Sequence, residues 1–214
     1  SHENAFCIVN RYPLKNGIVS LGGTDLAACN QIDEDLLSLL KKKIGRNVNR
    51  VKYEGGINIF LSGAVNHCFV CSYNELLQIR ECGFQLKKGC LLRLRDYGLN
   101  IPQDGVYVTK SFYKTHKKEV DGFVAASIKG WLWARQHVEQ TVGIVMRETT
   151  RERVGTNRYH QRQMLKEVLA LQKYNPKNPN AFKLSKQEFD KVIKLYTTIN
   201  KPYASKIKYA DLVR

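Results

Sequence analysis

The sequence predicts an α/β fold in its first half and a mostly helical second half. Up to about residue 95, short apolar runs bounded by turn residues alternate with segments whose apolar residues recur three and four positions apart. The first pattern is typical of buried strands and the second of helices. Strands that alternate with helices are typical of parallel sheets with right-handed crossovers, so we expect a parallel sheet.

Four strands and three helices are expected in the first half, after an irregular stretch over residues 1–16. Ligands of parallel α/β sheets bind in the crevice outside the carboxyl ends of the strands. The turns at residues 22–23, 54–56 and 72–75 are therefore candidate ligand sites. The strands are expected at residues 18–21, 48–53, 68–71 and 91–94, and the helices at residues 33–43, 57–62 and 73–81.

The second half begins with one more predicted strand, over residues 106–108, and is then helical almost to its end. Ser185 and Glu188 form a capping-box pattern, which predicts the start of a last long helix. The other helices are expected at residues 117–136, 138–148 and 159–174, before a proline-containing break over residues 175–180.

The chain carries 35 Lys and Arg residues against 19 Asp and Glu residues, a net charge of +16. A basic surface attracts phosphate, nucleic acid and anionic lipid. The lysines form short clusters beside expected helix ends and turns, which favours a generally basic surface over a nucleic-acid site. Six cysteines leave two interpretations open, disulfides or free buried thiols. They are Cys7, Cys29, Cys68, Cys71, Cys82 and Cys90.

A series of motifs extends from about residue 13 to the end of the chain. In order and spacing they resemble the solute-binding proteins for thiamine-pyrimidine precursors, riboflavin and sulfonates. The resemblance implies a type II periplasmic-binding fold, in which two α/β lobes joined by two crossing strands close on a ligand. The motifs are EGGINIFLSGAV at residues 54–65, SYNE at 72–75, DYGLNIP at 96–102, GVYVT at 105–109, FVAASIKGW at 123–131 and NRYHQR at 157–162.

The resemblance also implies a division into lobes. Residues 13–105 correspond to lobe two, and residues 106–214 to the returning strand and helices of lobe one. The opening strands and helices of lobe one have no counterpart, so we expect that lobe to be incomplete. A homodimer that completes the lobe is therefore one expectation, and a shortened module that acts in protein interaction or signalling is another.

The function that the resemblance implies is non-enzymatic binding of a pyrimidine, a thiamine precursor, a flavin or a sulfonate-like solute. The solute would be delivered to an ABC import system or to a sensor. The implied location is periplasmic or otherwise extracytoplasmic. The implied partner is a membrane permease or a sensor protein, and no cofactor is expected.

Six residues in two turns are the candidate ligand contacts. Glycine backbones allow close approach of a ligand. A carboxylate can accept from the amino group of a pyrimidine, and a tyrosine ring can stack on the pyrimidine ring. Two structural alternatives stay open: the glycines form only a tight turn, and Ser72 with Glu75 forms a capping box. The candidates are Gly55, Gly56, Asn58, Tyr73, Asn74 and Glu75.

A metal site is the less favoured interpretation of His67, Cys68 and Cys71. Two thiolates and an imidazole can ligate zinc or iron. The two cysteines lie three positions apart on an expected strand, however, where side chains point to opposite faces. Buried core cysteines are therefore expected. The alternative is an enzyme like the pyrimidine-precursor synthases, which share this fold and carry a denser cysteine cluster with iron. The short Cys-Phe-Val-Cys run disfavours it.

Overall fold

The computed structural model describes residues 2–29, 34–54, 56–178, 180–199 and 204–213. The chain forms two compact units. The sheet unit comprises residues 2–102 and 183–214, and the helical unit comprises residues 103–182. The boundary expected between residues 105 and 106 lies close to the first limit of the helical unit, whereas the return of residues 183–214 to the sheet unit was not expected. The assignment of lobes stays a prediction.

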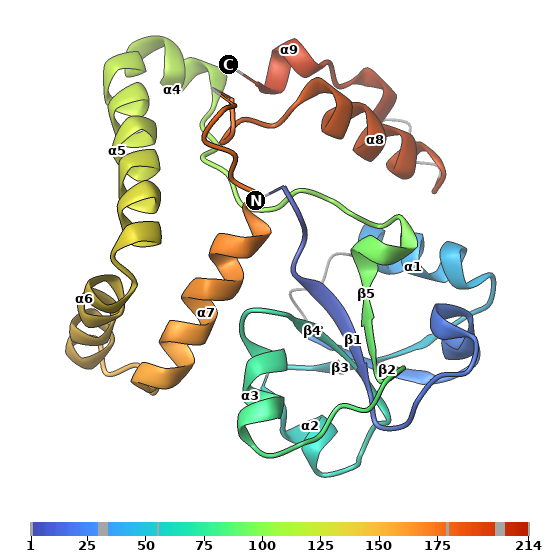
Figure 1. The fold of residues 1–214 in the computed structure, drawn as a ribbon. Helices are drawn as coiled ribbons and strands as arrows, with labels where there is room; N and C mark the ends of the chain where they lie inside the picture. The colour runs from blue at the N-terminus through green and yellow to red at the C-terminus, as the bar shows by residue number, and fades with distance from the viewer. Residues whose placement is uncertain (1, 30–33, 55, 179, 200–203, 214) are drawn as a thin grey trace. The chain divides into compact units, whose positions relative to one another are not determined.

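A five-stranded sheet in the order β3-β2-β4-β1-β5 organises the sheet unit (Figure 1). Strand β2 runs parallel to β3 and β4, which is the arrangement expected of the sheet, although no strand was predicted at residues 25–29. Strand β1 runs antiparallel to both β4 and β5, so the sheet is mixed and the expectation of a parallel sheet is wrong for these pairs. The strands are β1 (Phe6–Asn10), β2 (Asp25–Cys29), β3 (Asn49–Tyr53), β4 (His67–Cys71) and β5 (Leu91–Arg93).

Two stretches of the first half differ from the prediction. Residues 6–10 form β1 within a stretch that was expected to be irregular. The apolar run over residues 18–21 is not a strand but part of the 3₁₀ helix η1 (Gly17–Leu21), and the strand follows it as β2. The reason is the period: Ile18 and Leu21 are buried while Val19 is exposed, which is the three-residue repeat of a 3₁₀ turn.

Helices cover both faces of this sheet, which gives the unit two apolar cores. Helix α1 packs on one face against Ile8, Leu26 and Phe69. Helices α2 and α3 pack on the other face, where Phe60 is fully buried. Residue 33, the expected first residue of α1, lies outside the described residues. The helices of the sheet unit are α1 (Glu34–Ile44), α2 (Asn58–Leu61), α3 (Glu75–Glu81), α8 (Lys186–Thr197) and α9 (Tyr209–Leu212), with 3₁₀ turns η2 (Leu94–Tyr97) and η3 (Ala204–Lys206).

Helix α8 joins the sheet unit by packing beside α1. Its partly buried apolar residues Leu195, Tyr196 and Ile199, at and just after its end, contact the core on the α1 face. The predicted capping box is confirmed: the Ser185 hydroxyl accepts from the Glu188 N–H, and the Glu188 carboxylate accepts from the Ser185 N–H. These two hydrogen bonds fix the start of α8 at the position that the sequence predicted.

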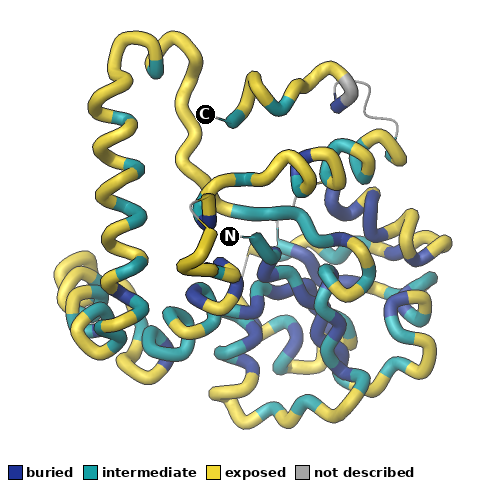
Figure 2. The backbone as a smooth tube through the Cα atoms, turned by 45° about the horizontal axis from the view of Figure 1, so that its top comes forward, coloured by how far each residue is buried: buried dark blue, intermediate teal, exposed yellow. Residues whose placement is uncertain are grey.

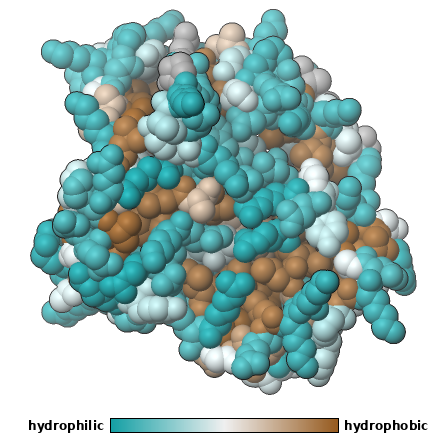
Figure 3. All heavy atoms as spheres, viewed as in Figure 1, coloured by the Kyte–Doolittle hydropathy of each residue, from teal (hydrophilic) through white to brown (hydrophobic). Residues whose placement is uncertain are grey.

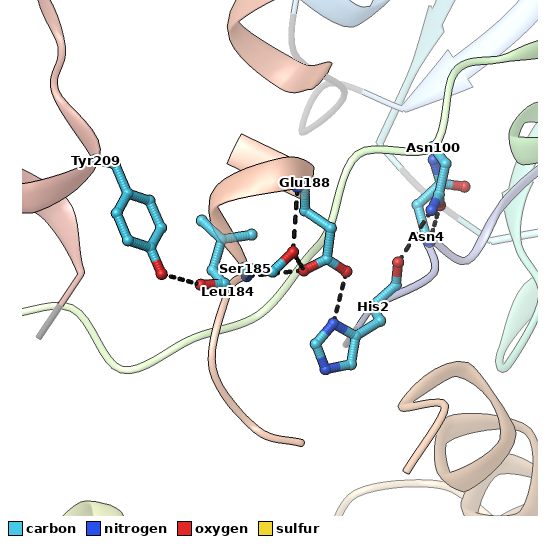
Figure 4. Close-up of polar contacts among 7 residues, drawn as sticks. All are labelled: His2, Asn4, Asn100, Leu184, Ser185, Glu188 and Tyr209. Atoms are coloured by element: carbon cyan, nitrogen blue, oxygen red, sulfur yellow. Dashed lines mark hydrogen bonds and ion pairs between the residues drawn. The ribbon is translucent and has the colours of Figure 1, made fainter. Parts of the chain in front are cut away.

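The capping carboxylate also connects α8 to the first residues of the chain (Figure 4). The imidazole Nδ1 of His2 lies 2.7 Å from Oε1 of Glu188. The Asn100 side-chain amide donates to the His2 carbonyl oxygen at 3.0 Å. On the other side, the Tyr209 hydroxyl donates to the Leu184 carbonyl oxygen at 2.7 Å. These contacts join the beginning, middle and end of the sheet unit's chain.

The described residues of the helical unit form four helices (Figure 1). The helices predicted at residues 117–136, 138–148 and 159–174 are confirmed with small shifts at their ends. The strand predicted at residues 106–108 is wrong, because the described residues of this unit contain no strand. Among the described residues, no helix is both long enough and apolar enough to cross a membrane. The helices are α4 (Lys110–Thr115), α5 (Lys117–Gln136), α6 (Val138–Arg151) and α7 (Arg158–Leu171).

Candidate ligand site at the carboxyl edge of the parallel strands

The parallel strands β3, β2 and β4 end at one edge of the sheet, at Tyr53, Cys29 and Cys71. Cys29 and Tyr53 are direct partners in the register of β2 and β3. The loops that follow β3 and β4 carry the six candidate residues. Because β2 lies between these strands, the two loops begin about two strand spacings, or ~10 Å, apart. That separation suits a small ring-containing ligand.

Glu75 is held in place by its neighbours in the loop after β4. Its Oε2 accepts from the Cys71 backbone N–H at 2.9 Å, and its Oε1 accepts from the Asn74 side-chain amide at 3.1 Å. The Asn74 side-chain oxygen accepts in turn from the Gln78 amide at 3.0 Å. The carboxylate is therefore preorganised at the strand end, and each oxygen retains a lone pair for a further donor.

The structural alternative of a capping box formed by Ser72 and Glu75 is wrong. Glu75 is the first residue of α3, and Asn74 occupies the N-cap position without a side-chain cap bond. Ser72 lies too far upstream to cap: its N–H donates to the Ala5 carbonyl oxygen at 2.8 Å. Its buried hydroxyl has no hydrogen-bond partner among the described residues. Glu75 instead reaches back to the last residue of β4, so local helix capping does not account for its position.

Neutral groups surround this carboxylate. Burial, together with the negative charge of Glu75, raises the pKa of Cys71 to about 12. Burial is also the main cause that raises the pKa of Cys68 to about 11 and moves the pKa of Tyr53 far above its usual value. The Tyr53 hydroxyl lies 3.6 Å from the Cys68 sulfur. At neutral pH these thiols and the phenol are uncharged, so Glu75 is the charged member of this group.

The loop after β3 offers an open backbone beside the exposed carboxylate of Glu54. Gly56 has a φ of +81° and is exposed, and a Cβ at this position would meet no heavy atom within 4 Å. A ligand can therefore approach the Gly56 backbone from the solvent. Asn58 is the first residue of α2, so it lies in the first turn of this helix, as expected. Its side chain is exposed. Gly55 lies outside the described residues.

The structure thus brings three candidate residues into one hydrogen-bonded group, namely the Tyr73–Asn74–Glu75 loop. The Tyr73 hydroxyl forms a hydrogen bond with the Cys71 sulfur, which links this half-buried ring to the same strand end. Gly56 and Asn58 lie on the separate loop after β3. Sequence reasoning missed Cys29 because β2 was not predicted. It predicted the strand that ends at Tyr53 but not that Tyr53 lies beside Cys29.

His67, Cys68 and Cys71 do not gather around one point. His67 begins β4 and its Nδ1 lies 2.8 Å from the Asn10 side-chain oxygen, while Cys71 ends the same strand. Burial lowers the pKa of His67. Cys68 belongs to the core on the α2 and α3 face, and Cys71 lies on the alternate side. All six cysteines are free. In the described part of the chain, no three His, Cys, Asp or Glu side chains form a possible metal site.

This mixed sheet with helices on both faces has the fold of periplasmic binding proteins. The aliphatic sulphonate binding protein SsuA from Escherichia coli matches with a TM-score of 0.58 and 11% identity, over 94% of this chain and 61% of that chain. The periplasmic sulfonate-binding protein SsuA from Methylobacillus flagellatus KT matches with a TM-score of 0.54 and 14% identity, over 92% and 59%. The chain therefore spans about three fifths of these solved structures.

A family model described as NMT1/THI5 like matches residues 4–141. The chain belongs to the NMT1/THI5-like family. This match and the two structural matches confirm the resemblance on which the predicted fold rested. No curated protein sequence matches the chain.

Proposed function

We propose that the chain binds a small solute at the carboxyl edge of β2, β3 and β4, without catalysing a reaction. The observation that carries the proposal is the pair of loops at this edge: one exposes the Gly56 backbone, and the other holds the Glu75 carboxylate on two hydrogen bonds. A few polar groups at the strand ends of an α/β sheet are typical of small-molecule sites. The bound solute would pass to a membrane permease or a sensor protein outside the cytoplasm.

The charges at this edge favour a ligand with an amino group. Glu75 has no cationic partner among the described residues, and it retains hydrogen-bond acceptor capacity. Arg50, whose guanidinium donates to the Cys29 carbonyl oxygen at 2.7 Å, already forms an ion pair with Glu34. A sulfonate would meet the charge of Glu75 without a guanidinium reserved for it. We therefore propose an amino-bearing heteroaromatic solute of the pyrimidine class.

Isothermal titration against an aminopyrimidine thiamine precursor, riboflavin and an aliphatic sulfonate tests this proposal. We expect one-to-one binding of the aminopyrimidine. At a ligand concentration of 100 Kd, binding adds about 2.7 kcal/mol to the free energy of unfolding, so a parallel thermal melt shifts upward. Binding of the sulfonate alone would contradict the ligand class. Neither heat nor a melting shift with any of the three would contradict solute binding itself, provided that circular dichroism shows a folded chain.

The variant Glu75→Gln tests whether the charge at this position contributes to binding, without removing the hydrogen bond that holds the loop. Gln retains an acceptor oxygen for the Cys71 N–H but carries no charge. We expect aminopyrimidine affinity to fall about tenfold or more, since a charge-assisted hydrogen bond is replaced by a neutral one. The matched control is Glu119→Gln, an exposed carboxylate in the first turn of α5 in the helical unit, which should leave the affinity unchanged within twofold.

A further inference from the structure

The loops at the amino edge of the sheet unit are basic. Strands β2, β3 and β4 begin at this edge, and the antiparallel β1 ends there, because Asn10 pairs with the first residue of β4. The loops at residues 11–24, 45–48 and 82–90 therefore lie at the edge opposite the candidate ligand site. Figure 2 shows exposed and intermediate segments joined to the largely buried strands of this unit. Five exposed cations lie in these loops and at the end of α1, namely Lys15, Lys43, Arg46, Lys87 and Lys88.

Direct contacts hold these loops next to one another. The Leu14 N–H, in the loop after β1, donates to the Gly89 carbonyl oxygen in the loop before β5 at 3.1 Å. The Arg46 side chain packs over Gly22, where an added Cβ would meet the Arg46 Cβ at 2.9 Å. The five cations therefore belong to one connected surface and not to independent loops.

Complementarity to a helix dipole does not account for this charge. It explains a lysine in the last turn of α1, such as Lys43. Lys15, Lys87 and Lys88, however, lie in loops, where no helix end calls for a cation. In the described parts of the chain, none of the five cations forms an ion pair with a carboxylate. Their charge is therefore available to a partner.

Carboxylates are more frequent at the other edge of the sheet. Glu54 and Glu75 follow β3 and β4, and Glu34 begins α1 after β2. Asp25 and Glu81, which border the loops of the amino edge, are two carboxylates against the five cations. A surface of one dominant sign directs partners of the opposite sign to itself. An anionic partner would thus approach the amino edge and leave the candidate ligand site free.

Two exposed apolar side chains lie among these cations and indicate the kind of partner. Tyr12, in the loop after β1, is 65% exposed, and Val19 is 50% exposed. The Val19 carbonyl oxygen accepts from the Gly22 N–H at 3.1 Å, directly beside Arg46. Figure 3 shows hydrophobic residues interspersed with hydrophilic side chains over the part of this face that the sheet unit occupies. Cations mixed with aromatic and aliphatic side chains are typical of a bilayer interface, whereas the backbone of duplex nucleic acid is matched by charge alone.

We propose that this amino-edge surface docks on the anionic phospholipid headgroups of a membrane. The cations extend from the segment before β3 to the segment before β5, which is four strand spacings, or ~19 Å. A single small anion reaches one or two of them, whereas a bilayer surface contacts the whole row. The proposal does not depend on the solute bound at the carboxyl edge. The amino-edge surface comprises Tyr12, Lys15, Val19, Lys43, Arg46, Lys87 and Lys88.

Co-sedimentation of the full chain with lipid vesicles tests the proposal. We expect binding to phosphatidylcholine vesicles that contain about 30 mol% phosphatidylglycerol, and at least tenfold weaker binding to phosphatidylcholine alone. Raising the salt from about 0.05 M to about 0.5 M should release the chain, because the contacts are exposed and electrostatic. Equal binding to both kinds of vesicle, or to neither in a chain that circular dichroism shows to be folded, would overturn the proposal.

A triple variant locates the binding surface. Each lysine or arginine near an anionic bilayer strengthens binding about fivefold, so the combined change of Lys43, Arg46 and Lys88 to Gln should weaken vesicle binding at least tenfold. The matched control loses the same charge elsewhere in the sheet unit, by change of three exposed lysines to Gln, and should bind within threefold of the original chain. An equal loss in both variants would show that only net charge matters and would contradict a defined surface. The control lysines are Lys183, Lys206 and Lys208.

The apolar residues distinguish a bilayer from other polyanions. The double variant Tyr12→Ser and Val19→Ser should weaken vesicle binding at least threefold, because it removes only apolar contacts. Ile207→Ser with Leu212→Ser, which changes two exposed apolar residues of the same unit, should not. No difference between the two double variants would count against a bilayer partner. Displacement of the chain from the vesicles by duplex DNA or polyglutamate at a lower concentration of negative charge would assign the surface to another class of partner.

Discussion

Removal of the Glu75 carboxylate should loosen the loop that follows β4. The variant Glu75→Ala eliminates the acceptor for the Cys71 N–H and for the Asn74 side-chain amide. A hydrogen bond to a charged group contributes about 1.5–3 kcal/mol, and the half-buried side chain reduces each value to about 1 kcal/mol because water replaces part of it. We therefore expect a loss of about 2 kcal/mol in the free energy of unfolding.

Thermal unfolding followed by circular dichroism measures this loss. For a chain of about 200 residues, 1 kcal/mol corresponds to about 2–4 °C, so Tm should fall by about 4–8 °C for Glu75→Ala. Glu75→Gln, which preserves one acceptor, should lose about half as much. The control Glu54→Gln should stay within about 0.5 kcal/mol of the original chain, as exposed substitutions do.

The charge of Glu75 supplies a second readout. Because this charge contributes to the raised pKa values of Cys71 and Cys68, Glu75→Gln should lower both. Alkylation of these thiols at pH 9 should then be faster in the variant than in the original chain. Equal Tm values for Glu75→Ala and Glu54→Gln, with unchanged alkylation rates, would refute the account of a carboxylate that organises the strand end.

Three further predictions concern the thiols, the core and the α8 start. At pH 8, iodoacetamide should modify the exposed Cys82 at least 100-fold faster than Cys71, whose pKa of about 12 leaves roughly one thiol in ten thousand ionised; peptide mass spectrometry measures both rates. Phe60→Ala should cost about 3–5 kcal/mol in urea unfolding, since the ring is fully buried; Phe60→Leu, as control, should cost less than half of that. Ser185→Ala should cost about 1 kcal/mol by loss of the capping hydroxyl, measured by the same unfolding.

The capping site also predicts a pH dependence. Burial raises the pKa of Glu188, but the hydrogen bonds from Ser185 and His2 outweigh it, so the folded-state pKa lies below the usual value. A carboxyl group with a lowered pKa stabilises the fold above its unfolded-state pKa of about 4.3, and this contribution is lost as the pH falls through the folded-state pKa. Glu188→Gln should therefore flatten the decline in Tm below about pH 5. An unchanged acid slope would contradict this role.

Residues with strong local signals were predictable from the sequence. The capping box at Ser185 and the helix over residues 117–136 depend on nearby residues, and the structure places both as expected. The turn at residues 72–75 was also predictable, because an apolar strand followed by polar residues marks a strand end. The spacing of Ser72 and Glu75 matches a capping box, but the Glu75 carboxylate accepts from the Cys71 N–H at the end of β4 instead.

What the sequence did not reveal depends on contacts between distant segments. Strand β1 has only five residues, and its antiparallel position between β4 and β5 is set by partners 57 to 86 positions away in the chain. The run at residues 18–21 is equally apolar, but its side chains fit a 3₁₀ turn against the core. Short apolar runs do not distinguish these outcomes, because strand formation depends on packing against neighbours.

The central claim is that a solute binds at the carboxyl edge of β2, β3 and β4. A titration of the ¹⁵N-labelled chain with the aminopyrimidine, followed by amide chemical shifts, tests it most directly. The account predicts saturable shifts concentrated in residues 53–58 and 71–78, which flank the Gly56 backbone and the Glu75 carboxylate. Saturable shifts confined to the helical unit, or no shifts at millimolar ligand in a folded chain, would contradict it.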